Sequence, residues 1–134
     1  MRPLPDVKHP DFAPFWEACR RHDMQLPMCG ACHLHFWPPR PVCPRCRSGS
    51  WQWEGHEGTG LVFSWTVVHR TTLPGFAEMV PYAIAVVQLD GPATLRLLGR
   101  WVDDIASLHI GLRARVTFEE LGEEVALPVW SRLR

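Results

Sequence analysis

Residues 29–46 read Cys29-Gly-Ala-Cys32-His-Leu-His-Phe-Trp-Pro-Pro-Arg-Pro-Val-Cys43-Pro-Arg-Cys46. This stretch holds two Cys-x-x-Cys pairs with ten residues between them, and in each pair both sulfurs can turn inward from one tight loop. Two such loops that face each other offer four thiolates in the tetrahedral arrangement that Zn²⁺ prefers. The prolines around them exclude a regular helix. We therefore predict a zinc ribbon over residues 26–50, with Cys29, Cys32, Cys43 and Cys46 as the metal ligands.

The metal of this ribbon is expected to be structural. A unit of about 25 residues buries too little surface to fold alone, and a structural zinc can supply ~10–16 kcal/mol. Four thiolates leave no open coordination position for Lewis-acid chemistry, and His33 and His35 are not needed as ligands. Iron would fit the same four sulfurs, and a redox or electron-transfer role for the cysteines is a further alternative. We expect the fifth cysteine, Cys19, to be a buried free thiol.

The composition describes a protein of one domain's length. The chain has 134 residues, 46% of them hydrophobic, and a formal net charge of zero. Residues 1–50 carry seven Lys or Arg against four Asp or Glu, whereas residues 51–134 carry seven against ten. Neither part has the basic excess that binding to nucleic-acid phosphates usually requires. No apolar run approaches the ~20 residues of a membrane span, and residues 1–6 lack the apolar region of a signal peptide. We therefore expect a cytoplasmic protein without a membrane partner.

A short aromatic helix is predicted ahead of the ribbon, within an N-terminal segment of residues 1–25. We expect it over residues 9–24, with Asp11 as the N-cap and Pro14 in the first turn. The side chains at i, i+3, i+4 and i+7 that share one helical face are Phe12, Phe15, Trp16 and Cys19. So short a helix is marginal alone and must dock on something. Docking on its own chain and docking on a partner chain both remain open.

Residues 51–134 carry a β pattern. Strands are predicted at 61–68, 82–89, 93–100, 112–118 and 125–130, with a turn at Asp90-Gly91 and one helical turn at 103–108. In the first strand, strict alternation would place Phe63 and Trp65 on the same face. Five short strands with a helical turn between the third and the fourth suggest a small Greek-key barrel of the OB type. The expected fold is therefore mainly β: a helical segment, a four-cysteine ribbon and a five-stranded OB-fold barrel.

Motifs along nearly the whole chain support a family resemblance. In chain order they are Phe15-Trp16, the two cysteine pairs, Trp37-Pro38-Pro39-Arg40, Gly58-Thr59-Gly60, Thr66-Val67-Val68-His69-Arg70, Pro74-Gly75-Phe76, Pro81-Tyr82, Gln88-Leu89-Asp90-Gly91, Ile110-Gly111-Leu112 and Leu127-Pro128. In these motifs and their order the chain resembles the domain-of-unknown-function 35 (DUF35) family. These are acyl-CoA-associated OB-fold proteins of lipid metabolism with a rubredoxin-like zinc ribbon.

The resemblance implies a role rather than a reaction. It predicts a non-catalytic accessory subunit in a hetero-oligomer with a thiolase-like enzyme: a thiolase, an acyltransferase or a steroid or lipid side-chain aldolase. It also implies an acyl-CoA site shared with that enzyme. The candidate contacts for coenzyme A or its acyl chain are Arg70, Phe76, Arg96 and Arg100. No catalytic residue set comes with the resemblance, and Ser64 and Ser107 lack a Gly-x-Ser-x-Gly frame.

The loop at residues 70–80 is unusually apolar for a connection between strands. It carries Leu73, Phe76, Met79 and Val80. One interpretation is that the loop folds over an end of the barrel and closes its core. The other is that it lines an acyl or pantetheine tunnel or packs against an enzyme partner.

The alternative class is a nucleic-acid-binding module, because OB barrels and zinc ribbons are both common there. Bases could stack on Trp51, Trp53, Phe63 and Trp65. The acidic residues Glu119, Glu120, Glu123 and Glu124 would repel phosphates. We therefore do not expect nucleic acid as a partner.

Overall fold

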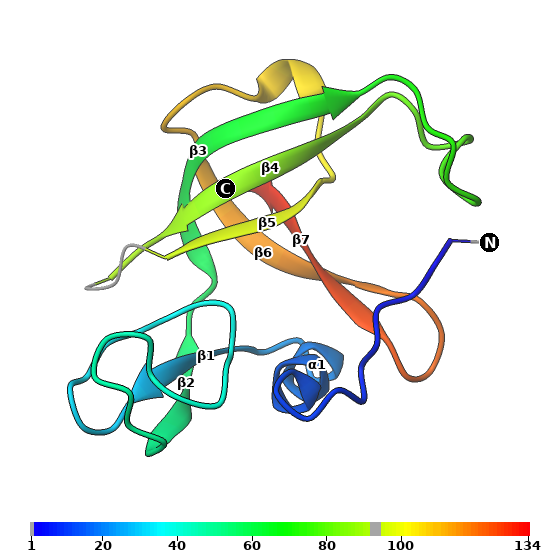
Figure 1. Cartoon of the computed structure of the whole chain (residues 1–134). Coiled ribbons are helices and arrows are strands. Elements are labelled where there is room, and N and C mark those ends of the chain that lie inside the picture. Colours follow the sequence, from blue (N-terminus) through cyan, green and yellow to red (C-terminus); the bar gives the residue numbers. More distant parts are fainter. Residues whose placement is uncertain (1, 92–94) are drawn as a thin grey trace.

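The computed structural model of the chain describes residues 2–91 and 95–134 (Figure 1). One helix, α1 (Ala13–Arg20), precedes a two-stranded antiparallel sheet and then a closed barrel with a 3-10 turn, η1 (Ile105–Ser107). The strands are β1 (Met24–Cys29) and β2 (Trp51–His56) in the two-stranded sheet, and β3 (Thr59–Val68), β4 (Tyr82–Leu89), β5 (Arg96–Trp101), β6 (Arg113–Glu120) and β7 (Ala126–Arg132) in the barrel. This confirms the predicted fold class. No helix within the described ranges is both long enough and apolar enough to cross a bilayer.

The barrel has the strand order of an OB-fold. Its order is β3-β4-β5-β7-β6, and β6 closes the barrel by pairing with β3. All neighbours are antiparallel except β5 and β7, which are parallel and meet at the single pair Trp101 and Trp130. The 3-10 turn lies between the third and fourth barrel strands, as predicted. The predicted third strand over 93–100 begins at Arg96 in the structure, and residues 93 and 94 of that prediction lie outside the described residues.

The side chains of strand β4 alternate between the outside and the inside of the barrel, and both of its alanines point inward. Ala83, Ala85 and Val87 are fully buried, whereas Tyr82, Ile84 and Val86 lie on the outer face and are half-buried. A closed five-stranded barrel has little interior volume, so small side chains suit its inside. Tyr82, Ile84 and Val86 therefore give the outside of this strand a largely apolar surface.

A β-bulge in β3 corrects the strict alternation expected for the first long strand. The register shifts between Val62 and Ser64, so that Phe63 is the extra residue. Phe63 is exposed, whereas Trp65 packs against the barrel core. The prediction that Phe63 and Trp65 share a face was wrong, because an inserted residue reverses the side-chain alternation beyond it.

The two-stranded sheet and the barrel share one hydrophobic core. Met24 and Leu26 on β1 belong to the same buried cluster as Val62, Val87 and Trp130 of the barrel. The partner of β1 is β2, which pairs with it from Met24 opposite His56 to Cys29 opposite Trp51. This sheet joins residues on both sides of each predicted segment boundary. The division into 1–25, 26–50 and 51–134 remains a prediction.

Helix α1 is shorter than predicted and uses its aromatic face within the chain. It begins after Phe12 rather than Asp11, because the backbone N–H groups of Phe12 and Ala13 already bond the His9 carbonyl in a preceding turn. Phe15 and Cys19 are buried against Ala126 of β7. Docking on its own chain is therefore the interpretation that the structure supports. Figure 1 shows the helix and the two-stranded sheet at the same end of the barrel.

A polar cluster fastens the end of β2 to the barrel. The ring of His56 lies with Nε2 2.7 Å from the Asp90 carbonyl oxygen, and its Nδ1 accepts a hydrogen bond from Gly58 N–H at 2.8 Å. The Asp90 carboxylate accepts a hydrogen bond from Thr59 Oγ1 at 2.8 Å and a two-pronged contact from the Arg113 guanidinium. This cluster holds the short β2–β3 connection against the β4 end of the barrel.

Candidate functional site

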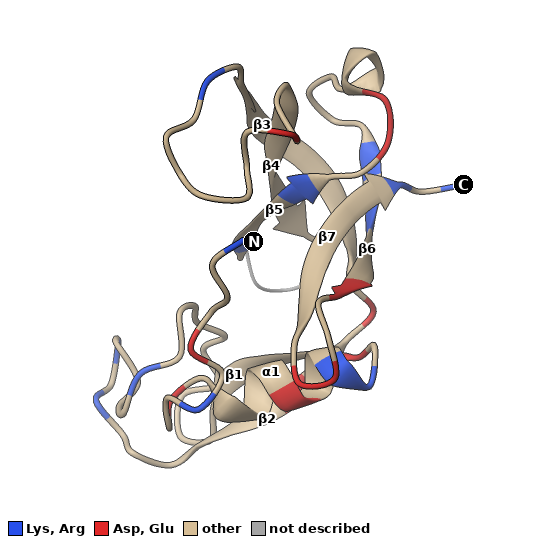
Figure 2. Ribbon diagram, turned by 90° about the vertical axis from the view of Figure 1, so that its right-hand side faces the viewer, with Lys and Arg blue, Asp and Glu red and all other residues tan. Residues whose placement is uncertain are grey.

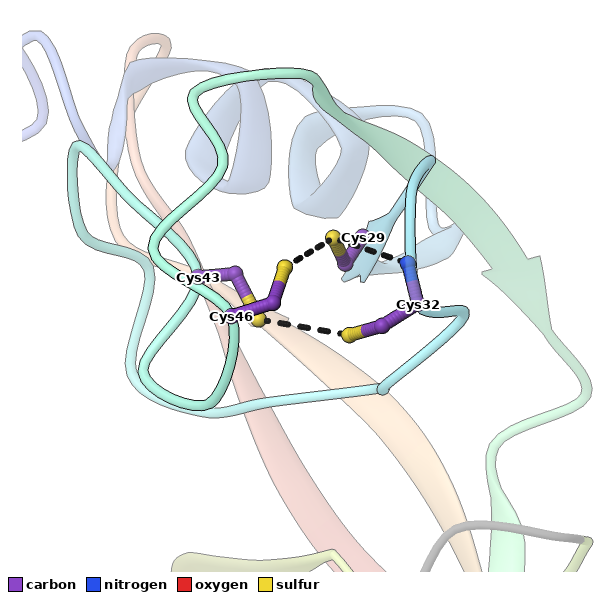
Figure 3. Close-up of side chains that lie close together, drawn as sticks. All are labelled: Cys29, Cys32, Cys43 and Cys46. Carbon is purple, nitrogen blue, oxygen red and sulfur yellow. Dashed lines mark hydrogen bonds between the residues drawn. The ribbon is translucent and has the colours of Figure 1, made fainter.

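The four predicted ligands come together in one cluster (Figure 3). All four Sγ atoms lie within 4.8 Å of one another, with 3.5 Å between Cys29 and Cys46 and 3.7 Å between Cys32 and Cys43. In a tetrahedron with metal–sulfur bonds of ~2.3 Å, neighbouring sulfurs are about 3.8 Å apart. The sulfurs are too far apart for disulfides, which need about 2.05 Å. The donor set and its spacing fit one tetrahedral metal ion.

Backbone N–H groups in both loops point at the sulfurs. Cys29 Sγ accepts hydrogen bonds from the N–H groups of Ala31 and Cys32, each at 3.4 Å, and Cys43 Sγ accepts one from Arg45 N–H at 3.4 Å. These bonds favour the thiolate, and the one from Cys32 N–H lowers the pKa of Cys29. They exist because each Cys-x-x-Cys loop turns its backbone inward. The backbone of the two loops therefore stabilises negative charge on the sulfurs independently of a metal.

The four thiols differ in how readily they ionise. A backbone hydrogen bond from Leu34 and the nearby Arg45 guanidinium lower the pKa of Cys32 to about 6. The backbone N–H of Ser48 favours the Cys46 thiolate, but the neighbouring sulfurs and partial desolvation outweigh it and raise the pKa of Cys46 to about 11. Four adjacent thiolates repel one another, so a cation is needed to hold all of them ionised.

The histidines near the cysteines have other partners or lie apart. His35 Nε2 is 3.4 Å from a carboxylate oxygen of Glu54 on β2. The cluster of possible metal ligands found within the described part of the chain contains the four cysteines and no histidine. Cys19 lies on the buried face of α1, and burial raises the pKa of its thiol to about 12. Cys19 is thus an inert packing residue, as predicted.

A second candidate site is a groove of about 420 Å³ on the outer face of the barrel. Side chains of β4, β5 and β7 form its floor, and its walls include Trp16 of α1 and Phe76 of the β3–β4 loop. OB-folds bind ligands on the face of their second and third strands and with the loops after their first and fourth strands. Here those strands are β4 and β5, and Phe76 and Leu121 come from those two loops. The groove therefore occupies the usual ligand face of the fold.

Three charged side chains meet at this groove. The Glu119 carboxylate accepts hydrogen bonds from Arg100 at 2.6 Å and from Arg2 at 3.1 Å. Arg2 also lies 3.7 Å from the sulfur of Met79, so the N-terminal segment is tied to the β3–β4 loop. Two guanidinium groups and one carboxylate leave a net positive charge beside an apolar floor.

The structure brings two of the four predicted coenzyme A contacts together and leaves two elsewhere. Phe76 and Arg100 both line the groove. Arg96 lies farther along β5, with its guanidinium carbon 3.8 Å from the centre of the Phe63 ring. Arg70 borders a separate hollow beside Thr71 and Val80. The contacts of all four with a ligand remain predictions.

The β3–β4 loop does not close the barrel core. Leu73 is 54% exposed, and the Phe76 ring packs at 6.0 Å from that of Tyr82 on the outer face. The interpretation in which the loop borders a ligand or partner site is therefore the one that its position supports. Sequence reasoning missed Arg2, Glu119 and Trp16 as groove residues. The apolar character of residues 82–89 on both faces of the strand is the sequence signal that could have pointed to this face.

Comparison with known proteins adds family information. A family model described as the C-terminal OB-fold domain of ChsH2 matches residues 53–119. A DUF35 domain-containing scaffold protein of Methanothermobacter thermautotrophicus is 31% identical, with 78% of each chain covered. A probable enoyl-CoA hydratase alpha subunit of Thermomonospora curvata is 35% identical over 97% of this chain. The present chain spans only 40% of the length of that hydratase subunit.

Two solved structures share the fold. A chain in the structure titled Ltp2-ChsH2(DUF35) aldolase is 31% identical, with a TM-score of 0.83 and 98% of each chain covered. A protein of unknown function from the DUF35 family of Sulfolobus solfataricus is 14% identical, with a TM-score of 0.64, 96% of this chain covered and 89% of the other.

Proposed function

Because this chain belongs to the DUF35 family of OB-fold proteins, we propose that it is a non-catalytic accessory subunit that scaffolds a thiolase-like, acyl-CoA-processing enzyme. The observation that carries the proposal is the apolar groove on the ligand face of the barrel. The names of similar proteins, a scaffold protein, a hydratase subunit and an aldolase complex, agree with an accessory role beside an enzyme.

The groove suits the acyl or pantetheine part of an acyl-CoA shared with the enzyme. Its floor is apolar, and Phe76 and Arg100 stand at its edge. Arg100 and Arg2 together outweigh the single carboxylate of Glu119, so an anionic group of the ligand would meet net positive charge. Arg70 and Arg96 would reach only a ligand that extends beyond the groove.

The cysteine cluster would hold one structural Zn²⁺. The sulfur spacing suits tetrahedral coordination, and the four thiolates would leave no position for substrate. When bound, the ion supplies cross-linking of the two loops and no Lewis-acid chemistry. Iron would accept the same four sulfurs, so elemental analysis decides the metal. A reduced cysteine cluster is typical of the cytoplasm, where we place the protein.

The nucleic-acid alternative has less support. Single-strand binding needs aromatic platforms along a positive groove. The groove is positive and holds Trp16, Phe76 and Tyr82, but none of the four residues predicted to stack bases lines it, and the Phe63 ring is covered by Arg96. Trp51 and Trp53 belong to the two-stranded sheet, and Trp65 packs on the core. The acidic turn between β6 and β7 lies beside α1 (Figure 2).

Direct binding tests the proposal. The purified chain is mixed with the Ltp2 protein of the solved aldolase complex and, separately, with any thiolase-like enzyme that proves to be encoded beside its own gene. We expect co-elution in size-exclusion chromatography, with a mass above the enzyme alone by a multiple of 15.3 kDa. A chain that binds neither enzyme, yet shifts oligothymidylate at ~150 mM salt, would favour the nucleic-acid class.

A further inference from the structure

The aromatic face of α1 is not available for an enzyme partner. Phe15 and Cys19 are buried within the chain, and Trp16 lines the groove. A scaffold of this family must therefore present another surface to the enzyme. The apolar side chains exposed on the outside of the barrel are the candidates for this contact.

The outer side of β3, β4 and β5 carries such a surface. Leu98 on β5 is 67% exposed, and its partner across β4 is Val86, which in turn pairs with Ser64 of β3. The bulge turns the neighbouring Phe63 outward, where it is 42% exposed. We call Phe63, Val86, Arg96 and Leu98 the docking face. Figure 1 shows the three strands side by side along one side of the barrel.

Arg96 gives this face a fixed charge. Its guanidinium lies over the Phe63 ring at 3.8 Å, and its Nε donates a hydrogen bond to the Gln88 side chain at 3.4 Å. A cation held on an aromatic ring loses little further freedom on binding. Within the described residues the salt bridges of the protein do not include Arg96. An aromatic ring and an arginine are the residue types that dominate interface energies.

The charges argue against a second copy as the occupant. Arg96 and Arg100 are the only charged residues on β3, β4 and β5, and Arg100 already pairs with Glu119 of β6, which it shares with Arg2. Two copies in face-to-face contact would bring arginines together without a carboxylate from these strands. An enzyme surface with an apolar patch beside an Asp or Glu would complement both Leu98 and Arg96.

We propose that the enzyme partner docks on this face, with an apolar patch over Leu98 and Phe63 and a carboxylate that meets Arg96. The inference rests on the proposed scaffold function and adds the surface through which it acts. The groove adjoins this face, because Leu98 also lines the groove. An enzyme seated here would therefore cover the groove and bring its own acyl-CoA site next to it.

Matched substitutions test the docking face. Leu98→Asp and Phe63→Asp place a charge in the centre of the contact, and Arg96→Glu reverses its charge. The control is Val42→Asp, because Val42 is 43% exposed, close to the 42% of Phe63, and belongs to the ribbon between β1 and β2 rather than to β3, β4 or β5. Melting temperature and metal content of each variant show whether it remains folded. Binding to whichever enzyme the wild type binds is measured by titration calorimetry.

We expect Leu98→Asp and Phe63→Asp to raise the dissociation constant on the order of 30-fold or more, as for residues at the centre of an interface. Val42→Asp should stay within about twofold, as expected for a residue outside the contact. Folded Leu98→Asp and Phe63→Asp variants that bind as the wild type does would overturn the docking face and leave the scaffold function standing. Loss of binding in Val42→Asp alone would move the contact to the ribbon. If the wild type forms a dimer and the Leu98→Asp variant is a monomer, the face binds a second copy of the chain. A wild-type chain that binds neither enzyme would contradict both proposals.

Discussion

Replacing Leu26 by alanine tests whether the ribbon and the barrel are one folding unit. Leu26 is 2% exposed and lies on β1, three residues before the first cysteine of the ribbon, yet it packs in the barrel core cluster. Truncation of a buried leucine removes its transfer free energy and leaves a cavity, at a cost of ~2–5 kcal/mol. The unfolding entropy of ~2.1 cal/mol/K per residue then converts this cost into a fall in melting temperature of about 7–18 °C.

The assay is urea unfolding followed by tryptophan fluorescence, because Trp101 and Trp130 lie in the barrel core. Leu98→Ala is the matched control. Leu98 is the same residue type on the surface, and the cost there should be within about 0.5 kcal/mol. A Leu26→Ala variant that loses less than about 1 kcal/mol, or a barrel transition that keeps its midpoint while the ribbon melts separately, would refute the shared core.

Three further predictions concern the metal cluster, the barrel closure and the polar cluster. Cys43→Ser, or an excess of chelator, should release the metal, which elemental analysis would show. It should also lower the melting temperature of the barrel as well as that of the ribbon, measured by circular dichroism. An unchanged melting temperature of the barrel would contradict the coupling of the two. Gly60→Ala should destabilise by ~1–3 kcal/mol in urea unfolding, because the added Cβ would clash with the backbone oxygen of Gln88, and a neutral result would mean that β3 and β4 can separate there. The Arg113 guanidinium lowers the pKa of Asp90 from 3.8 to about 2, so this carboxylate stabilises the fold above pH 4 and loses that effect as the pH falls towards 2. Because Asp90 is partly exposed, Asp90→Asn should lower the free energy of unfolding by no more than ~1 kcal/mol at pH 7, and by almost nothing near pH 2. Equal losses at both pH values in urea unfolding would contradict the ion pair.

The cysteine cluster is the part of the site that the sequence predicts best. A Cys-x-x-Cys loop is closed by local backbone geometry, so the spacing of Cys29 and Cys32 already implies inward sulfurs. That the second loop faces the first depends on β1 and β2, which pair residues 24–29 with residues 51–56. The sequence predicted neither strand, because β1 carries Pro27 and the alternation in β2 covers only the four residues Trp51-Gln52-Trp53-Glu54.

The barrel strands were predicted from their alternation, and the departures have local causes. The bulge at Phe63 adds one residue to β3 and is invisible to a period of two. The helix start moved to Ala13 because His9 accepts bonds from two backbone N–H groups in a turn before the helix. The groove depends on contacts between distant residues, such as Arg2 with Glu119, which no local pattern contains. The residues of the ligand face can therefore be identified only from the folded structure.

The accessory role can be measured as the acyl-CoA turnover of the partner enzyme while this chain is titrated into it. If the chain scaffolds the enzyme, turnover rises and saturates at a fixed ratio of chain to enzyme, and the chain alone turns over no acyl-CoA. Folded Leu98→Asp must then be added at much higher concentration to reach the same rate. Turnover by the isolated chain, or an enzyme whose rate and mass do not respond to the chain at any ratio, would contradict an accessory scaffold.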